Sequence, residues 1–405
     1  MYSRTDVTEF IAENDVKFIR LAFCDVFGKQ KNISIQPCLL EEAFETGIPI
    51  NSSLIAGFGD EASPDVYLVP DPSTMSVLPW RPSQGRVVRF FCHIRTTAGE
   101  PFALDSRHIL REAVRALTAH NLTVSFGAEC EFYLFKTDEN GIPTDVPLDK
   151  GGYLDLAPAD RGENVRREIC LTLEEMSIVP ESSHHENGPG QNEIDFRKSD
   201  PLTSADNVTT FKNVVQTVAQ KNGLHARFDP KPIADGDGNG LHINVQLSTE
   251  DLSLCRSFMA GILRRVKEMT LFLNPDESSY RRLSDCFSAR YITWGDTRSN
   301  MLRATPSAGS GFLFEICSPD CLANPYIAYA LVIYAGLEGI REKAELPEKC
   351  SSNLYRLPPD ELKSFDSLPE TLAEAAKLCL SGSFIGKHLP HELIDAYAGR
   401  AGLRV

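Results

Sequence analysis

The stretch "GAECEFYLF", residues 127–135, decides the architecture of the longer part of this chain. Its β-branched, aromatic and aliphatic residues favour a β-strand. Within it, Glu129 and Glu131 are two positions apart, so their side chains point to the same face of that strand. Two ionised carboxylates on one face repel each other and resist burial. A cation has to compensate them, or the pair faces solvent at a sheet edge. The stretch alone leaves both interpretations open.

Length and composition limit the class of protein. A chain of 405 residues is too long for one ordinary core, which favours two domains. The net charge of −15 makes nucleic acid and anionic membranes poor partners for the surface as a whole. No apolar run approaches the roughly 20 residues that a membrane span needs. The 11 cysteines contain no CxxC pair, which is typical of buried thiols in a reducing cytoplasm.

The chain divides near a polar segment. Residues 6–95 read as a small α/β unit in which "VFGK" (26–29) turns a hairpin. The segment 95–107 contains Gly and Pro and is the best linker candidate. Beyond it, amphipathic helices alternate with strands that look antiparallel, which predicts an α+β catalytic domain. The predicted helices are 106–121, 161–177, 204–222 and 251–272, and the predicted strands are 122–135, 191–197, 225–230, 241–247 and 311–317.

More carboxylates lie in or beside the other predicted strands. Glu186 and Glu193 flank a Gly-Pro-Gly turn, which would bring them to one end of the sheet. His242 opens a strand after a glycine-rich loop, and Glu315 lies inside an apolar strand. Oxygen ligands with one imidazole suit Mg²⁺ or Mn²⁺. Five carboxylates could hold two such ions, and two divalent cations are what phosphoryl transfer uses.

Two neighbouring features have simpler interpretations. His184 and His185 precede Glu186 and are interpreted as part of a polar turn. Cys317 and Cys321 have no cluster of partner ligands and are interpreted as buried thiols.

The segment 274–306 is unusually basic for an acidic chain. A carboxylate-and-metal site that handles phosphates also needs cations for the oxygens of the transferred group. We therefore expect at least two of its arginines to be functional, although pairing with surface acids is the alternative. These arginines are Arg281, Arg282, Arg290, Arg298 and Arg303.

Taken together, these motifs resemble the glutamine synthetases of the bacterial type I class over essentially the whole length. The resemblance implies an N-terminal β-grasp domain (1–98) and a catalytic domain (105–405) with a curved antiparallel sheet and helices. It also implies a dodecamer of two stacked hexameric rings with active sites between neighbouring subunits. The motifs that carry it are "KFIRLAFCDVFGK", "VYLVPDPSTMSVLPW", "GAECEFYLF", "HHENGPGQNEIDF", "GLHINVQL", "NPDESSYRRL", "SPDCLANPYIAYALVIYAGLEGI" and "NLYRLPP".

The resemblance also implies roles for individual side chains. Its reaction uses ATP to phosphorylate the side chain of glutamate, and ammonia then attacks the γ-glutamyl phosphate. Two ions, Mg²⁺ or Mn²⁺, assist. By position, Glu131, Glu186 and Glu193 would hold one ion, and Glu129, His242 and Glu315 would hold the other. The substrate would be contacted by Arg282, Glu131 and Gly238. Arg298 and Arg303 would contact phosphates, and Arg298 would also be a catalytic residue.

Several positions depart from the family pattern. The ammonium-binding aspartate of the family corresponds here to Asn51, and the flap segment 284–294 contains no glutamate. Leu313 and Cys317 stand where the family has arginines on either side of the metal-binding glutamate. The metal ligands are therefore complete, while the groups that recognise substrates are altered. Tyr355 occupies the position that is adenylylated in some members, and we interpret it as a structural residue.

Three functions follow from this pattern. One is an ATP-dependent ligase that joins a small carboxylate to an amine other than ammonia through an acyl phosphate. The second is glutamine synthetase itself, with an atypical pocket. The third is a ring-forming scaffold or regulatory homologue without catalysis. An ammonium ion needs anionic ligands to be held and deprotonated, so the loss of those ligands favours the first.

Overall fold

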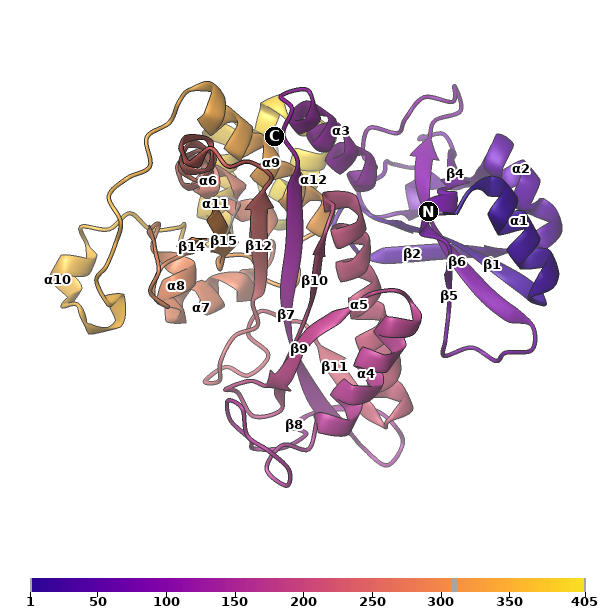
Figure 1. Ribbon diagram of the computed structural model, residues 1–405, viewed down its shortest axis with the longest axis horizontal. Coiled ribbons are helices and arrows are strands. Elements are labelled where there is room, and N and C mark those ends of the chain that lie inside the picture. The colour runs from indigo at the N-terminus through magenta and orange to yellow at the C-terminus, as the bar shows by residue number, and fades with distance from the viewer. Residues whose placement is uncertain (1, 307–311, 404–405) are drawn as a thin grey trace.

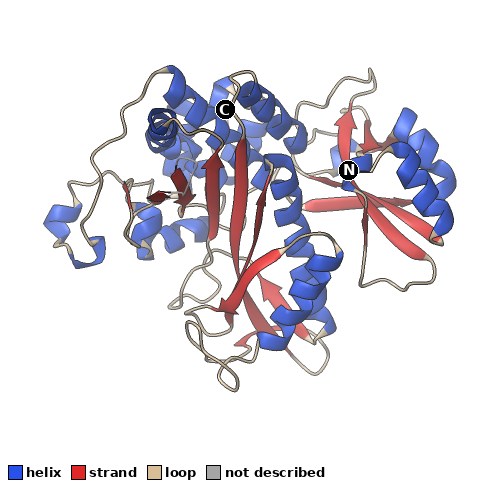
Figure 2. Ribbon diagram, viewed as in Figure 1, coloured by secondary structure: helices blue, strands red, loops and turns tan. Residues whose placement is uncertain are grey.

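The computed structural model describes residues 2–306 and 312–403. Two sheets lie side by side, and most of the helices cover the larger one (Figures 1 and 2). This is the α+β architecture that the sequence predicts. Within the described residues, no helix is both long and apolar enough to cross a bilayer.

The N-terminal sheet is a mixed sheet with the order β2-β1-β6-β4-β3, and β5 pairs with β6. The predicted hairpin is present, because β1 and β2 pair antiparallel on either side of the turn. β1 and β6 run parallel in the middle of the sheet. The elements are α1 (Arg4–Glu13), β1 (Val16–Cys24), β2 (Gln30–Ile35), α2 (Leu40–Glu45), β3 (Ile48–Ile50), β4 (Val66–Pro70), β5 (Ser76–Val77) and β6 (Arg86–Arg95).

The second sheet has nine strands in the order β13-β14-β15-β12-β7-β10-β9, with β8 and β11 also paired to β7. Neighbours are antiparallel except β13 and β14, which are parallel. The long β7 runs through the centre (Figure 1). The strands are β7 (Val124–Thr137), β8 (Pro143–Pro147), β9 (Pro180–His185), β10 (Gln191–Ser199), β11 (Leu224–Arg227), β12 (Leu241–Leu247), β13 (Trp294–Gly295), β14 (Leu302–Pro306) and β15 (Phe312–Ile316).

Helices cover one face of this sheet. Aspartates begin two of these helices. The Asp105 side chain accepts a hydrogen bond from the backbone of α3, and Asp200 caps α5 immediately before a proline. The helices are α3 (Ser106–Thr118), α4 (Glu163–Glu175), α5 (Pro201–Lys221), α6 (Leu252–Leu273), α7 (Glu277–Asp285), α8 (Phe287–Arg290), α9 (Pro325–Arg341), α10 (Pro359–Leu362), α11 (Leu372–Ser381) and α12 (His391–Arg400).

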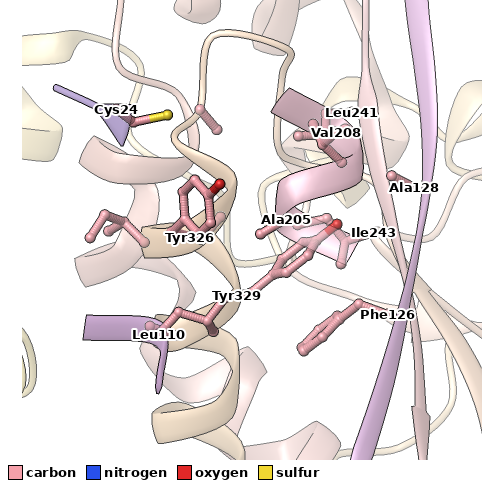
Figure 3. Packing of buried hydrophobic residues seen from close by; sticks show 14 of the residues in the cluster. Cys24, Leu110, Phe126, Ala128, Ala205, Val208, Leu241, Ile243, Tyr326 and Tyr329 are labelled. Atoms are coloured by element: carbon pink, nitrogen blue, oxygen red, sulfur yellow. The ribbon is translucent and has the colours of Figure 1, made fainter. Parts of the chain in front are cut away.

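The core lies between that face of the sheet and α5 and α9. Phe126 of β7 stacks on Tyr329 of α9, with ring centroids 4.3 Å apart (Figure 3). Buried apolar side chains continue from here into the N-terminal sheet. The Asn324 amide, at the start of α9, donates to the backbone oxygen of Val26 at 3.0 Å in the β1–β2 turn. The N-terminal sheet is therefore anchored to the catalytic part, and the domain limits 1–98 and 105–405 remain predictions.

Helices α6 and α9 cross through glycines. A Cβ at Gly339 would lie 2.1 Å from the backbone oxygen of Ser257 and 2.7 Å from the Cα of Gly261. Because both contacts are backbone atoms of α6, a side chain here would push the helices apart. We expect Gly339→Ala to lower the free energy of unfolding by about 3 kcal/mol, measured by chemical denaturation.

The matched control is Gly399→Ala in α12, where no described atom outside the helix's own backbone lies within 4 Å of the added Cβ. That change should leave stability unchanged or raise it by about 0.5–1 kcal/mol, the helix propensity difference. Equal stability of the two variants would contradict the close crossing of α6 and α9.

Candidate active site

The uncovered face of the large sheet is polar across five neighbouring strands. Side chains alternate between the two faces of each strand, and the antiparallel register places these residues in rows. His242 of β12 lies opposite Glu129 of β7, and Glu193 of β10 lies opposite Glu131. Glu315 of β15 lies opposite Asn244, which is two positions after His242 in β12. The alternation that puts Ala128 and Cys130 in the core therefore puts the glutamates on the opposite face.

The structure brings together all six predicted metal ligands. His242 Nδ1 lies 3.3 Å from Glu129 Oε2 and 2.9 Å from Glu315 Oε1, and its Nε2 lies 3.9 Å from Glu131 Oε1. His184 lies between Glu186 and Glu193. Its Nδ1 is 3.6 Å from Glu186 Oε1, and its Nε2 is 3.6 Å from Glu193 Oε1. The predicted convergence of the six residues is thus present, while their roles as ligands remain a proposal.

The charges on this face are poorly balanced. Burial and the neighbouring charge of Glu131 raise the pKa of Glu193 to about 10. Burial also raises the pKa of Glu131. For Glu129, burial acts in the same direction, but the hydrogen bond with His242 outweighs it and lowers the pKa to about 2. Burial acts to lower the pKa of His242, but the bond to Glu129 and the surrounding charges raise it to about 10.

This donor set fits divalent cations. A bound cation would favour the ionised form of every crowded carboxylate and so oppose the raised pKa values. Two buried atoms on this face, His184 Nδ1 and Asp195 Oδ1, have no hydrogen-bond partner among the described residues. Carboxylate oxygens with imidazole suit Mg²⁺ and Mn²⁺ better than a structural zinc ion.

Sequence reasoning missed two members of this face. Asp195 lies opposite Glu129 in β10, and His184 lies opposite Glu193 in β9. His184, Glu193 and Asp195 each offer one atom within 4.8 Å of the others. The signal for Asp195 was available, because it follows Glu193 by two positions, as Glu131 follows Glu129. The prediction that His184 and His185 form a polar turn was wrong, because both belong to β9.

A buried network holds the turn that carries Glu186. His185 is fully buried, and its Nδ1 lies 2.6 Å from the backbone oxygen of Glu186. Its Nε2 lies 2.9 Å from Asp149 Oδ1, which also accepts a hydrogen bond from the backbone of Gly190. Gly190 has φ of +73°, a conformation that favours glycine. These contacts fix the chain on both sides of the Gly-Pro-Gly turn.

Glu131 is the most firmly held carboxylate of the group. Its Oε2 accepts hydrogen bonds from the backbone of Gly240 at 2.9 Å and from Gln191 Nε2 at 3.0 Å. The same amide of Gln191 donates to the backbone oxygen of Gly238 at 3.1 Å. A Cβ at Gly238 would lie 2.7 Å from Arg282 Cγ and from the backbone oxygen of Pro230, so the loop requires glycine there. Gly238 is therefore placed beside the site, and its contact with substrate stays a prediction.

The three predicted functional arginines have different surroundings. Arg303 donates through Nη2 to Glu315 and lies 3.5 Å from His242 Nδ1. Arg298 is exposed and has no ion pair or hydrogen bond with the described residues. Arg282 is buried and donates to the backbone oxygens of Ser318 and Cys317 at 2.8 and 3.0 Å. Arg282 thus holds the chain that follows β15 in place. The sequence predicted a contact with a substrate carboxylate for Arg282 and did not predict this structural role.

The departures from the family pattern have clear structural surroundings. Cys317 is buried, and its thiol lies 3.5 Å from Glu315 Oε1. Asn51 is exposed, and its side-chain oxygen accepts hydrogen bonds from the backbone and hydroxyl of Ser53. Tyr355 is 55% exposed and stacks on Phe287, with ring centroids 4.8 Å apart. Phe287 belongs to the segment 284–294 that corresponds to the family flap, and Tyr355 packs on it from the short 3-10 helix Leu354–Arg356.

A sheet with one face covered by helices and the other lined by carboxylates is an arrangement that suits metal-dependent phosphoryl transfer. Comparison with known proteins specifies the family. The profile described as "Glutamine synthetase, catalytic domain" matches residues 103–401, and "Glutamine synthetase, beta-Grasp domain" matches residues 15–97. This chain belongs to the glutamine synthetase family. Its relatives in that family are ATP-dependent ligases that form a C–N bond, and this chain is an enzyme of that type.

Individual relatives cover nearly the whole chain. The glutamine synthetase of Clostridium saccharobutylicum is 39% identical over 99% of this chain and 94% of that protein. The glutamine synthetase of Staphylococcus epidermidis is also 39% identical, over 98% of this chain and 94% of that protein. A solved structure described as "GmaS/ADP complex-Conformation 1" superposes with a TM-score of 0.87 at 26% identity, covering 98% of this chain and 94% of that one.

Proposed function

We propose that this enzyme joins the side-chain carboxylate of glutamate, or of a related small acid, to an amine other than ammonia. The observation that carries the proposal is that, within the described residues, Asn51 and the segment 284–294 offer no free anion where the family holds ammonium. Asn51 is neutral, and its oxygen is already bonded to Ser53. The one acidic residue of the segment 284–294, Asp285, is paired with Lys231 at 2.5 Å.

The surroundings of that segment fit an organic amine better than a small cation. Phe287 and Tyr355 stack face to face, with an interplanar angle of 11°. Aromatic faces contact alkyl groups and attract alkylammonium cations without supplying a full negative charge. An amine with a carbon substituent would gain from such a contact, whereas ammonium would lose the ion pairs that hold and deprotonate it.

The acid is activated by phosphoryl transfer from ATP. A carboxylate oxygen of the acid attacks the γ-phosphorus, the bond to the bridging oxygen breaks, and ADP leaves. The amine nitrogen then attacks the acyl carbon, phosphate departs, and the nitrogen loses a proton. Divalent cations, when bound, neutralise charge on the phosphate oxygens during the first step.

The residues of this chain position those groups. Glu131, Glu186 and Glu193 would hold one cation, and Glu129, His242 and Glu315 the other, with Mg²⁺ or Mn²⁺ favoured by the oxygen-rich donor set. Arg303 lies beside the second group, where its guanidinium would contact transferred phosphate. The exposed Arg298 would act as a second phosphate contact and stabilise the charge that develops during transfer. ADP is bound in the similar GmaS structure, which supports a nucleotide site in this chain.

Assembly belongs to the same proposal. The family arrangement of two stacked hexameric rings, with active sites between neighbouring subunits, would bring Asn51 of one subunit toward the catalytic sheet of the next. We therefore propose a dodecamer in the cytoplasm as the working form of the enzyme.

Ordinary glutamine synthetase activity is the second candidate. The observation that favours it is the 39% identity to two proteins named glutamine synthetase. That identity covers the fold and the metal-binding face, which both functions share, and it does not restore an anion at position 51.

A panel of amines separates these functions. Purified protein is incubated with ATP, Mg²⁺ or Mn²⁺, glutamate and one of ammonia, methylamine, ethylamine, ethanolamine or putrescine. Phosphate release is followed, and mass spectrometry identifies the product. We expect release with at least one organic amine and at least about tenfold lower kcat/KM with ammonia. Phosphate release with ammonia alone would establish glutamine synthetase activity. The absence of phosphate release with every acid and amine would favour a scaffold.

A further inference from the structure

A cavity of about 300 Å³ lies between the N-terminal sheet and α5, apart from the metal-binding face. Its wall comes from β1, β2, β6 and the segment before β6 on one side, and from α5 on the other. Figure 1 shows the N-terminal sheet beside α5, which covers the face of the large sheet opposite to the glutamates. The volume lies in the range of small-molecule sites.

The charge of this cavity is opposite to that of the protein. Its lining contains Arg20, Arg81, Arg89 and Lys221, and none of the described residues that line it is Asp or Glu. The whole chain has a net charge of −15, so such a local excess of cations is unusual.

Two of the arginines are forced together by the sheet. Arg20 of β1 and Arg89 of β6 are direct partners in the parallel register. Like charges on neighbouring strands destabilise a sheet unless something compensates them. Arg20 donates through Nη1 to Asn32 at 3.0 Å, which is a neutral partner.

Arg89 is the residue that most requires a counter-ion. Its side chain is 7% exposed, and it forms no ion pair with any described residue. Asp206 acts on it electrostatically, but that carboxylate is paired with Arg107 at 3.1 Å. Arg89 Nη1 donates to Thr210 at 3.0 Å, and burial lowers the pKa of Arg89 to about 10. A buried guanidinium without an acid partner is costly in a folded protein.

Three residues of the cavity lining also carry buried polar atoms that lack a partner. Arg20 Nε, Arg89 Nε and Gln30 Oε1 are buried and have no hydrogen-bond partner among the described residues. All three residues line the cavity. Two guanidinium groups on neighbouring strands of one wall are the kind of donors that carboxylates and phosphates match.

We propose that this cavity binds a compact anion with two or more carboxylate or phosphate oxyanion groups. Arg20 and Arg89 would bind one group at the base, and Arg81 and Lys221 would bind another at the mouth. The indole of Trp80 and the side chain of Leu78 form the apolar part of the wall, against which the carbon skeleton would lie. Binding here requires neither a metal ion nor ATP, so it is independent of the proposed ligase activity.

The two possible sources of this chemistry are tested with pyrophosphate and succinate. The chain has 2 tryptophans, so a Trp294→Phe background leaves Trp80 as the only indole reporter. Each probe is titrated at constant ionic strength with EDTA and without ATP, and both tryptophan fluorescence and calorimetric heat are recorded. We expect saturable binding of at least one probe with one site per chain, and the probe that binds identifies the source.

Variants locate the binding. Arg81→Gln changes an exposed residue and Arg20→Gln a half-buried one, and each should weaken binding at least about tenfold, the value of one charge-assisted hydrogen bond. Arg95→Gln, an exposed arginine of the same sheet outside the cavity, should bind as the parent does. Arg298→Gln should also bind normally, which separates this cavity from the phosphate contacts of the active site. Circular dichroism checks the fold of each variant.

Two results would overturn the proposal. One is the absence of saturable binding of both probes to the parent protein. The other is unchanged affinity in folded Arg81→Gln and Arg20→Gln, which would place the anion elsewhere.

Discussion

Replacing Glu131 by Gln is expected to lower kcat for ATP-dependent amide formation at least about 100-fold. Glu131 lies opposite Glu193 at the centre of the polar face and lies 3.9 Å from His242. The glutamine side chain has nearly the same shape, and its oxygen can still accept from Gly240 and Gln191. The change therefore removes a negative charge while leaving the packing in place. The measurement is initial rate against Mg²⁺ or Mn²⁺ concentration at saturating ATP.

The metal dependence distinguishes this effect from a loss of structure. If Glu131 holds a cation, the variant requires a higher metal concentration for half-maximal rate, and the free energy of unfolding without metal stays the same or rises, because a crowded charge has gone. Glu181→Gln is the matched control, since Glu181 lies in β9 of the same sheet, beyond β10, with its side chain 54% exposed. It should retain parental activity. A Glu131→Gln variant with parental kcat and metal dependence would contradict the role of this residue.

Replacing Arg303 by Gln should lower kcat about 100- to 1000-fold, the usual loss when a donor to developing charge is removed. Arg303 is paired in β14 directly opposite Glu315, to which it donates. The guanidinium thus lies beside the proposed metal ligands, where the phosphate oxygens of ATP would arrive. The KM for ATP should also rise, because the contact exists before and during transfer. The measurement is steady-state kinetics with ATP as the varied substrate.

Arg303→Lys provides a conservative comparison. Lysine keeps the charge but loses the planar fork that contacts two oxygens at once, so we expect a partial recovery of kcat. Arg264→Gln is the control, because Arg264 lies in α6 with its side chain 50% exposed and is paired with Glu342 at 3.2 Å. Equal activity of Arg303→Gln and Arg264→Gln would show that Arg303 only balances the charge of Glu315.

Much of the site could be predicted because β-strand alternation is a local rule. The spacing of Glu129 and Glu131 placed both on one face, and the strand predicted at 241–247 is observed as β12 with the same bounds. The pairing of β7 with β10 and β12 then brings the remaining ligands to that face. No local pattern predicted β9, whose sequence "PESSHH" has none of the apolar and β-branched residues that favour strands. It is a strand because β10 supplies its hydrogen bonds.

Other features depend on contacts between distant segments. The buried position of Arg282 follows from two backbone oxygens after β15, which no spacing in the sequence reveals. The pairing of Arg20 with Arg89 depends on the parallel register of β1 and β6. The missing anion near Asn51 was visible in the sequence, whereas the pairing of Asp285 with Lys231 was visible only in the fold. Charge pairing of this kind decides which acids are free to bind substrate.

We propose that six side chains of one sheet face bind two divalent cations. Crystals of the enzyme grown with Mn²⁺ and an ATP analogue, measured for anomalous scattering, test it most directly. We expect two peaks per chain, one within coordinating distance of Glu131, Glu186 and Glu193 and the other beside Glu129, His242 and Glu315. A single peak, or peaks located only elsewhere in the chain, would contradict it.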